Sequence, residues 1–294
     1  MVGDTGWRRA RLVAGFILPS LVPLAAFTVI PMVWSVGVSF TEWNLLRPAE
    51  WVGFDNYTAL ASDPTFLKAL GNTAFYIAGY LPLAFAGGLG IALLLNRGVA
   101  GLGFFRSVYF LPVVTSWVVV AVVWRWLLQP EGGVVNYLLS VAGIDGPGWW
   151  TSPVWAMPSV ILASAWKDLG FIMVIFLAGL QNISADYFEA ARVDGANWWT
   201  QFRRITLPLL SPSSLFVVVI ALIGGFQVFD QVYVMTGGGP AGASVVVVEQ
   251  IYTNAFRFGK MGYAAAMSWA LFAAIFAVTV GQLRLQRRWV HYDR

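Results

Sequence analysis

The chain has 294 residues, of which 59% are hydrophobic and 11% charged, and its mean hydropathy is +0.71. Soluble domains contain about 45–50% apolar and about 25% charged residues, so this composition excludes an ordinary soluble domain and indicates an integral membrane protein. The absence of cysteine excludes disulfides, thiolate metal sites and cysteine nucleophiles. The net charge of +4 reflects membrane topology rather than nucleic-acid binding, because the basic residues are distributed unevenly between segments.

Uncharged apolar runs of spanning length predict six transmembrane helices. In chain order these predicted spans lie between residues 11 and 42, between 68 and 97, and at about 107–128, 155–180, 209–230 and 261–283. The first run follows three arginines, as in a signal peptide, but it is too long for a signal h-region, so we expect a retained span at about 12–40. We therefore expect one all-α transmembrane domain over residues 1–294, with a core at about 70–285.

The distribution of lysine and arginine predicts the orientation of these spans. With the N-terminus in the cytoplasm, the cytoplasmic segments hold Arg8, Arg9, Arg11, Arg97, Arg106, Arg192, Arg203, Arg204, Arg284, Arg287, Arg288 and Arg294. The external segments hold only Arg47, Lys68, Arg257 and Lys260. Arg125 and Lys167 lie within spans. The bias of twelve against four predicts that both termini are cytoplasmic.

A polar, charged segment separates the fourth and fifth predicted spans. It reads Glu189-Ala190-Ala191, three residues ending at Asp194, then Gly195, nine residues, and Ile205-Thr206-Leu207-Pro208. Asp186 and Glu189 have the spacing of a capping box, which predicts the start of a helix. Gly195 is well placed to end that helix, and Pro208 prevents a second short helix from running unchanged into the next span.

Two segments on the predicted external side carry aromatic and acidic residues. Residues 42–68 contain Glu42, Glu50, Asp55, Asp63, Trp43, Trp51, Phe54 and Tyr57. Two interpretations stay open: an interfacial aromatic belt, or a surface that meets an external partner. Residues 129–153 are a second candidate for such a surface.

Polar residues inside predicted spans are costly and indicate function. Gln227 and Asp230 are three residues apart, which predicts one helical face, with Phe226 and Phe229 nearby. In sugar sites, aromatic faces cover sugar rings while amides and carboxylates bind hydroxyls. The alternative is that Asp230 caps the end of the span or pairs with a neighbouring helix. The adjacent Lys167 and Asp168 face different directions, which favours a structural role for both.

The motifs of an ATPase or of a hydrolase are absent from the sequence. No G-x-x-x-x-G-K-[ST] phosphate loop occurs. Ser164 and Lys167 have an S-x-x-K spacing, but they lie in an apolar run without the accompanying motifs, and we interpret the spacing as coincidence. The lone His291 cannot form a metal cluster. We expect no catalytic residue, no metal site and no bound cofactor in this chain.

The chain resembles the carbohydrate-type ABC importer permeases, the group that includes the maltose and glycerol-3-phosphate permeases. The Glu-Ala-Ala, Gly and Ile-x-Leu-Pro segment described above matches the coupling loop of ABC-importer permeases in general. Three further parts narrow the resemblance to this group: Val52-Gly53-Phe54-Asp55-Asn56-Tyr57 with Asn72-Thr73, Phe104-Phe105-Arg106 with Leu111-Pro112, and Phe226-Gln227-Val228-Phe229-Asp230 with the Gly-Gly-Gly-Pro turn.

The resemblance implies a multi-pass inner-membrane subunit with six core helices and a cytoplasmic coupling loop between helices 4 and 5. It implies four kinds of partner: a second homologous permease, a dimer of ATP-binding-cassette ATPases that uses ATP and Mg, an extracytoplasmic solute-binding protein, and lipid. It assigns ATPase coupling to Glu189, Ala190, Ala191, Asp194 and Gly195, and the solute path to Phe226, Gln227, Phe229 and Asp230. The expected solute is a sugar or related polyhydroxylated compound, with glycerol-3-phosphate or a glycerophosphodiester as the alternative. A secondary transporter or a non-transporting scaffold remains the alternative function.

Overall fold

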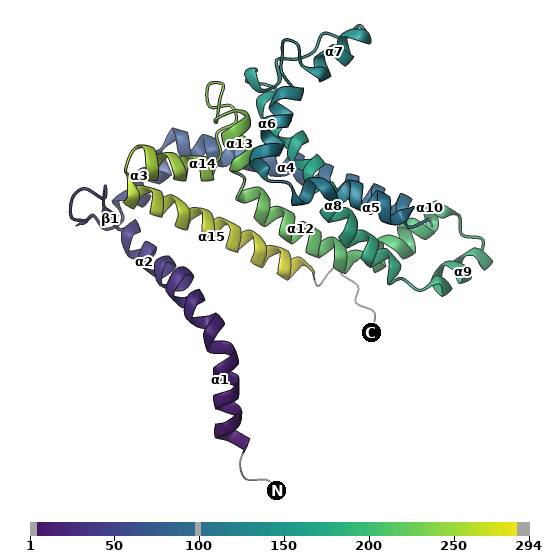
Figure 1. Cartoon of the computed structure of the whole chain (residues 1–294), viewed down its shortest axis with the longest axis horizontal. Coiled ribbons are helices and arrows are strands. Elements are labelled where there is room, and N and C mark those ends of the chain that lie inside the picture. Colours follow the sequence, from purple (N-terminus) through teal and green to yellow (C-terminus); the bar gives the residue numbers. More distant parts are fainter. Residues whose placement is uncertain (1–4, 98–100, 287–294) are drawn as a thin grey trace. The chain divides into compact units, whose positions relative to one another are not determined.

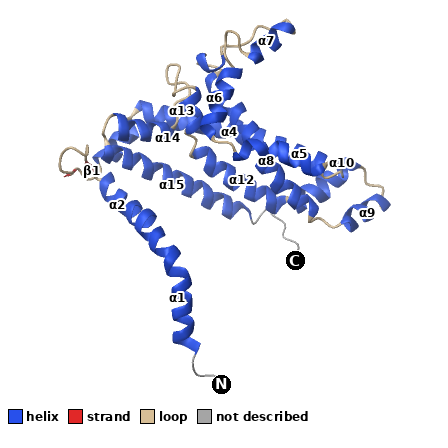
Figure 2. Ribbon diagram, viewed as in Figure 1, coloured by secondary structure: helices blue, strands red, loops and turns tan. Residues whose placement is uncertain are grey.

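The computed structural model describes residues 5–97 and 101–286, which are mostly helical (Figures 1 and 2). The chain divides into two compact units: unit 1 comprises Met1–Asp63 and Ile251–Ala270, and unit 2 comprises Pro64–Gln250 and Leu271–Arg294. The basic tail that holds Arg287, Arg288, His291 and Arg294 lies outside the described residues. The single domain predicted over 1–294 stays a prediction.

Unit 1 is built from a long N-terminal helix and a small layer of short elements. It contains α1 (Thr5–Leu24), the π-helical turn η1 (Ala25–Val29), α2 (Ile30–Ser39), β1 (Thr41–Glu42), β2 (Glu50–Trp51), α3 (Asp55–Ser62), η4 (Thr253–Arg257) and the beginning of α15 (Met261–Leu285). The segment Arg11–Ser39 is long and apolar enough to cross a membrane, and its most apolar window is 0% buried inside the chain. This confirms the first predicted span as a helix and leaves most of its surface for lipid or another chain.

The Val-Gly-Phe-Asp-Asn-Tyr motif holds the two-stranded hairpin against the end of α2. The Asn56 Nδ2 donates to the backbone carbonyls of Ser39, at 2.9 Å, and Thr41, at 3.0 Å. The Tyr57 hydroxyl shares a 2.7 Å hydrogen bond with the Ser39 Oγ. The ring of Phe40 packs 5.5 Å from that of Tyr57. These residues of the motif are thus used for local architecture.

Unit 2 contains most of the helices and a buried core. Its elements are α4 (Pro64–Leu95), α5 (Leu102–Val114), α6 (Trp117–Leu127), α7 (Val134–Val141), η2 (Trp149–Thr151), α8 (Ala156–Gln181), α9 (Ala185–Val193), α10 (Trp198–Gln201), η3 (Phe202–Thr206), α11 (Leu207–Leu209), α12 (Ser211–Phe226), α13 (Asp230–Met235), most of α14 (Val247–Tyr252) and the end of α15. Of the most apolar window of α8, 61% is buried, against 33% for α4. Helix α8 is therefore the central helix of this unit, with α4, α5 and α12 packed on it.

Two of the predicted spans are bent, which apolar composition alone does not indicate. The run predicted at 107–128 is formed by α5 and α6, which meet at an angle of 99°. The run predicted at 209–230 starts earlier, because Trp198–Leu209 and Ser211–Phe226 form a pair bent by 64°. The second bend falls at Leu210, between Pro208 and Pro212, which cannot donate backbone hydrogen bonds.

The effect expected of Pro208 is confirmed, because the short helix does not continue unchanged into the next span. The chain stays helical through η3 and α11 and bends only after Leu209. The described residues contain four unbroken helices long enough to span a membrane, and up to six candidate spans if each bent pair counts as one. The count of six stays a prediction.

Candidate coupling segment and solute path

The segment with the Glu-Ala-Ala sequence forms the separate helix α9 between α8 and α10. Ser184 caps its N-terminus, since its Oγ accepts from the backbone N–H of Asp186 at 3.3 Å. The expected capping box is wrong: Asp186 lies in the first turn and Glu189 lies in the middle of the helix. The sequence did offer the observed cap, because serine is a preferred capping residue and Ser184 directly precedes the helix.

Gly195 ends α9 as predicted, in a left-handed conformation with a φ of +76°. The N–H of Gly195 donates to the carbonyl of Arg192 at 3.1 Å, and the N–H of Ala196 donates to that of Ala191 at 2.8 Å. This pair of hydrogen bonds is a Schellman motif, which satisfies carbonyls that a helix end leaves without partners. The chain then turns into α10, whose cap Asn197 accepts from the N–H of Thr200 at 2.9 Å.

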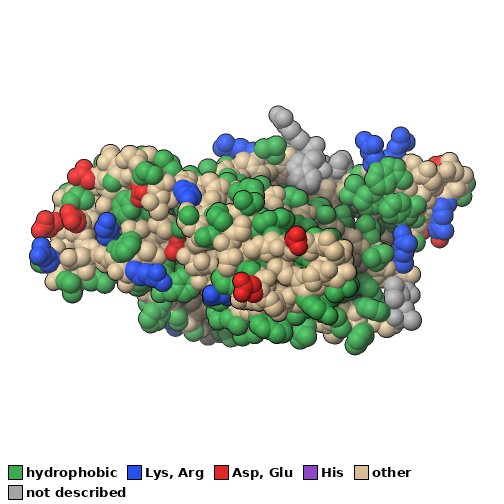
Figure 3. Space-filling view, turned by 90° about the horizontal axis from the view of Figure 1, so that it is seen from above, with side chains coloured by type: hydrophobic (Ala, Val, Ile, Leu, Met, Phe, Trp, Pro, Cys, Tyr) green, Lys and Arg blue, Asp and Glu red, His purple; other side chains and the backbone are tan. Residues whose placement is uncertain are grey.

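None of the nine residues of α9 is buried within the chain. Val193 is 89% exposed and Tyr187 48% exposed. Beside α9, the rings of Trp198 and Phe202 stack with centroids 5.5 Å apart. Figure 3 shows lysine and arginine side chains gathered at the right-hand end of the view, over the region of α9 and α10. A helix this short is marginal in water on its own, so its surface is suited to contact with another molecule.

The junction between α12 and α13 holds the four residues predicted for the solute path. Phe226 is the last residue of α12, and Asp230 is the first residue of α13. Gln227 and Asp230 therefore do not lie on one helical face, which corrects that expectation. Gly224 and Gly225 have low helix propensity and lie just before the end of α12. They are the sequence feature that indicates this helix end, although the apolar run continues past them.

The side chains at this junction are nevertheless presented to the outside of unit 2. Gln227 and Asp230 are exposed, while Phe226 and Phe229 are half-buried. Val228, at 2% exposed, anchors the junction in the core. Asp230 is also the first residue of α13, where the helix dipole stabilises a carboxylate. Both a solute-contacting role and a capping role are compatible with this position.

A buried polar network in unit 2 was not predicted. Gln231, 6% exposed, donates from its Nε2 to the Tyr76 hydroxyl at 3.3 Å and to the Ser164 Oγ at 3.4 Å. The rings of Tyr76 and Tyr80 stack with centroids 5.3 Å apart, and the Tyr80 hydroxyl donates to the Asp168 carboxylate at 2.6 Å. The network joins α4, α8 and α13. Two sequence features indicated parts of it: the spacing of the two tyrosines, four residues apart in one helix, and the structural role expected of Asp168.

The segment directly after the Gly-Gly-Gly-Pro turn is held by the start of α4. The Lys68 Nζ donates to the carbonyl of Ala241 at 2.8 Å. The Asn72 Nδ2 donates to the carbonyls of Gly242, at 3.1 Å, and Val245, at 2.9 Å. Asn72, from one of the motifs that carried the family resemblance, therefore contacts the segment directly after the Gly-Gly-Gly-Pro turn of another.

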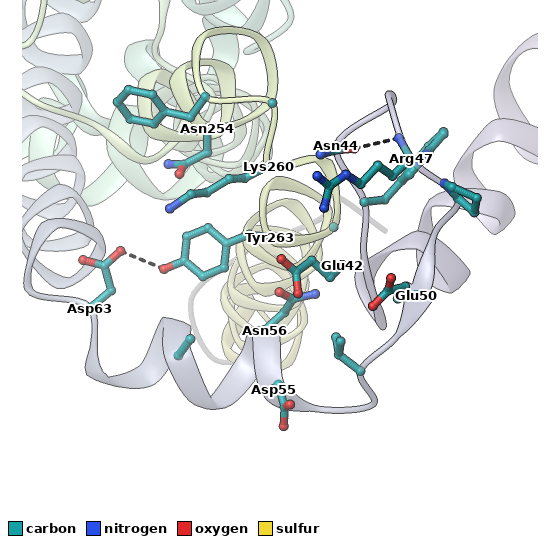
Figure 4. A pocket seen from close by; sticks show the side chains of 17 residues that line it. Glu42, Asn44, Arg47, Glu50, Asp55, Asn56, Asp63, Asn254, Lys260 and Tyr263 are labelled. Atoms are coloured by element: carbon teal, nitrogen blue, oxygen red, sulfur yellow. Dashed lines mark hydrogen bonds between the residues drawn. The ribbon is translucent and has the colours of Figure 1, made fainter.

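A polar cavity of about 790 Å³ lies in unit 1, between the hairpin, α3 and the start of α15 (Figure 4). Its lining includes the carboxylates of Glu42, Glu50, Asp55 and Asp63 and the basic side chains of Arg47 and Lys260. The hydroxyl of Tyr263 donates to the carboxylate of Asp63 at 2.7 Å (Figure 4). The strand register places Glu42 opposite Glu50, and like charges in that position destabilise a hairpin. Within the described residues, no three His, Cys, Asp or Glu side chains form a group that could hold a metal.

Residues 84–291 match the family described as binding-protein-dependent transport system inner membrane component. The chain is 36% identical to the probable ABC transporter permease protein YesP of Bacillus subtilis, over 95% of this chain and 91% of that protein. It is also 36% identical to the sulfoquinovosyl glycerol transport system permease protein SmoG of Agrobacterium fabrum, over 94% of this chain and 91% of that protein.

A solved structure extends the similarity to the whole fold. A chain of a bacterial alginate ABC transporter, in complex with an alginate pentasaccharide-bound periplasmic protein, superimposes with a TM-score of 0.84. The two chains are 26% identical, and the alignment covers 96% of each. By sequence and by structure, the chain belongs to the inner-membrane component family of binding-protein-dependent transport systems, and it is an ABC transporter permease.

Proposed function

We propose that this chain is a permease subunit of an ATP-driven, binding-protein-dependent importer for a sugar or a related polyhydroxylated solute. The observation that carries the proposal is α9, a capped and terminated helix that has no buried residue within its own chain. A helix with defined ends and no buried residue within its own chain is suited to bind in a groove of another protein. In this proposal, that protein is the ATPase.

Coupling requires that α9 transmit the movement of an ATPase to the spanning helices. Ala190 and Ala191 have small side chains that permit close docking, and the exposed Glu189 can reach a basic residue of the ATPase. The Schellman motif at Gly195 and the cap at Ser184 fix the two ends of α9, and with them the length and direction of the helix. Asp194, the last residue before the turn, belongs to the same docking surface. ATP and Mg are bound and used by the ATPase dimer, not by this chain.

The orientation follows from the arginine asymmetry, with both termini and α9 in the cytoplasm. The cavity in unit 1, with its four carboxylates, then lies on the external side, as part of the surface that meets the solute-binding protein. The complex of the similar alginate transporter with a periplasmic protein supports such a partner. A second permease completes the pathway, and lipid or that permease covers the exposed first span.

The proposed solute path runs past the α12–α13 junction. The exposed amide of Gln227 and carboxylate of Asp230 can bind hydroxyl groups, and the half-buried rings of Phe226 and Phe229 can cover the apolar face of a sugar. Among similar permeases, SmoG is named for sulfoquinovosyl glycerol and another, of Rhizobium radiobacter, for lactose. These names support the carbohydrate class, with a glycerol phosphate as the second candidate.

Copurification tests the proposal against a secondary transporter or a scaffold. The tagged chain, extracted gently from its native membrane, should bring down an ATPase and a second permease. The ATPase activity of that complex should rise when solute-loaded binding protein is added. A chain that purifies alone and supports uptake driven by an ion gradient would contradict the proposal.

Reporter fusions test the orientation separately. Fusions after Arg97 and within residues 192–204 should report a cytoplasmic location, and those within residues 50–60 and 240–245 an external one. A cytoplasmic signal at residue 55 would contradict the proposed topology.

A further inference from the structure

The bend between α5 and α6 leaves backbone carbonyls that a continuous helix would satisfy. In such a helix, the carbonyls of Leu111, Pro112 and Val113 would accept from the amides four residues later. Here the carbonyl of Leu111 accepts from the Thr115 Oγ1 at 3.1 Å, and the carbonyl of Pro112 accepts from the Thr115 N–H at 3.2 Å. The carbonyl of Val113 accepts from the Lys167 Nζ of α8 at 3.0 Å. Lys167 thus replaces the amide of Trp117.

The environment of Lys167 makes this contact specific. Its side chain is only 5% exposed, and its Nζ lies 4.9 Å from the ring centroid of Trp117, the first residue of α6. One ammonium group therefore contacts the last turn of α5 and the first turn of α6. An irregular backbone in a spanning segment needs such a donor, because lipid supplies none. The neighbouring Asp168 faces Tyr80 of α4, as expected for two adjacent helical residues that point in different directions.

The backbones of α5 and α8 are in close contact one turn from Lys167. A Cβ atom added at Gly170 would overlap the carbonyl of Tyr109 in α5, so glycine permits this approach. The end of α5 is therefore fixed to α8 at two places, by close packing and by the lysine. Helix α6 in turn contacts α13, where the Arg125 guanidinium donates to the carbonyl of Val234 at 3.4 Å.

These contacts form a continuous path from α9 to the α12–α13 junction. Only Asn182, Ile183 and Ser184 separate the end of α8 from α9. Lys167 lies about 20 Å along α8 from Gln181, at a rise of about 1.5 Å per residue. From there the path continues through the α5–α6 bend into α6 and then α13, which begins at Asp230.

We propose that Lys167 is a positioning residue that fixes the α5–α6 bend to α8, so that movement of α9 reaches α6 and the solute path. This inference rests on the proposed function, because it takes α9 as the segment that an ATPase moves. Without the lysine, the bend loses its polar link to α8 and follows α8 less closely, although the Gly170 contact with α5 and the contact of α8 with Gln231 of α13 remain. A larger share of the ATP is then hydrolysed without productive opening of the path. A purely structural lysine would instead affect assembly of the complex.

The test uses the complete importer, with its own ATPase, second permease and binding protein, in vesicles of native lipid. Lys167→Met removes the donor at similar length, and Lys167→Arg keeps a cationic donor. Three quantities are measured on each preparation: assembled complex, ATP hydrolysis, and solute imported per ATP. We expect Lys167→Met to assemble and hydrolyse ATP while solute imported per ATP falls about tenfold, with at least half of the loss restored in Lys167→Arg. Lys68→Met, which removes the lysine that holds the 236–245 turn, should leave this ratio unchanged.

Two further variants keep the inference open to refutation. Thr115→Val removes the hydroxyl that donates to the carbonyl of Leu111 at the same bend, but it leaves the contact between Lys167 and Val113. Import per ATP should therefore be retained. An equal loss of import per ATP in Thr115→Val and Lys167→Met would overturn the proposal, as would an unchanged ratio in Lys167→Met. If Lys167→Met does not assemble, the ratio is measured on Lys167→Leu, which also lacks a donor, and an unchanged value there overturns the proposal. A wild-type chain without an associated ATPase would instead refute the proposed function.

Discussion

Replacing Gly195 tests whether the end of α9 is needed for coupling. The backbone of Gly195 has a φ of +76°, and a Cβ atom there would have no neighbour within 4 Å. The substitution Gly195→Ala therefore acts through the backbone alone, since alanine in this conformation costs about 1–2 kcal/mol. That energy corresponds to a roughly five- to thirtyfold shift from the Schellman turn toward other conformations. Because α9 has no buried residue, no packing within the chain compensates for the loss.

We expect solute-stimulated ATPase activity per assembled complex to fall severalfold in Gly195→Ala, while membrane insertion is unchanged. The matched control is Gly195→Asn, because asparagine tolerates the left-handed conformation and should retain most of the activity. Gly103→Ala, in a glycine without positive φ and with open space around it, controls for the loss of a glycine elsewhere. Wild-type activity in Gly195→Ala, or equal losses in the alanine and asparagine variants, would refute this reasoning.

Three other changes have defined outcomes. Ser184→Ala removes the cap of α9, which costs about 1 kcal/mol, so hydrogen exchange should become faster in the first turn of α9 and stay unchanged in α8. Asp230→Asn removes a charged acceptor, and the lost hydrogen bond costs about 1.5–3 kcal/mol. We therefore expect a roughly ten- to hundredfold weaker apparent affinity for solute, in transport measured with saturated binding protein. An unchanged rate per assembled complex would remove Asp230 from the solute path and leave it as a helix-capping residue. Asn72→Ala removes two hydrogen bonds to the 236–245 turn, together worth about 1–3 kcal/mol. Hydrogen exchange in this turn should therefore become faster, while exchange in α7 stays unchanged as an internal reference. Equal exchange of the turn in the wild type and the variant would show that Lys68 and packing are enough to hold it.

The sequence by itself determined the class of the protein and most of its helices. Long apolar runs with few charges can be stable only as helices in lipid, because every backbone group must be satisfied within the segment. The spans near 12–40, 68–97, 155–180 and 261–283 therefore agree with helices in the structure. The end of α9 at Gly195 was also predictable, since a left-handed turn after a helix is a local preference of glycine.

Only the tertiary structure decided where spans bend and which polar residues meet. At the bend after Val114, the carbonyl of Val113 accepts from Lys167, 54 residues further along the chain, whose ammonium replaces a backbone donor. The hydropathy of residues 107–128 does not indicate this contact. Nothing in the sequence connects Gln231, Tyr76 and Asp168, and their network exists only because α4, α8 and α13 pack together. The single helical face predicted for Gln227 and Asp230 was wrong for the same reason. Regular periodicity describes a residue's neighbours along a continuous helix, whereas at a break the side chains are placed by the elements packed on either side.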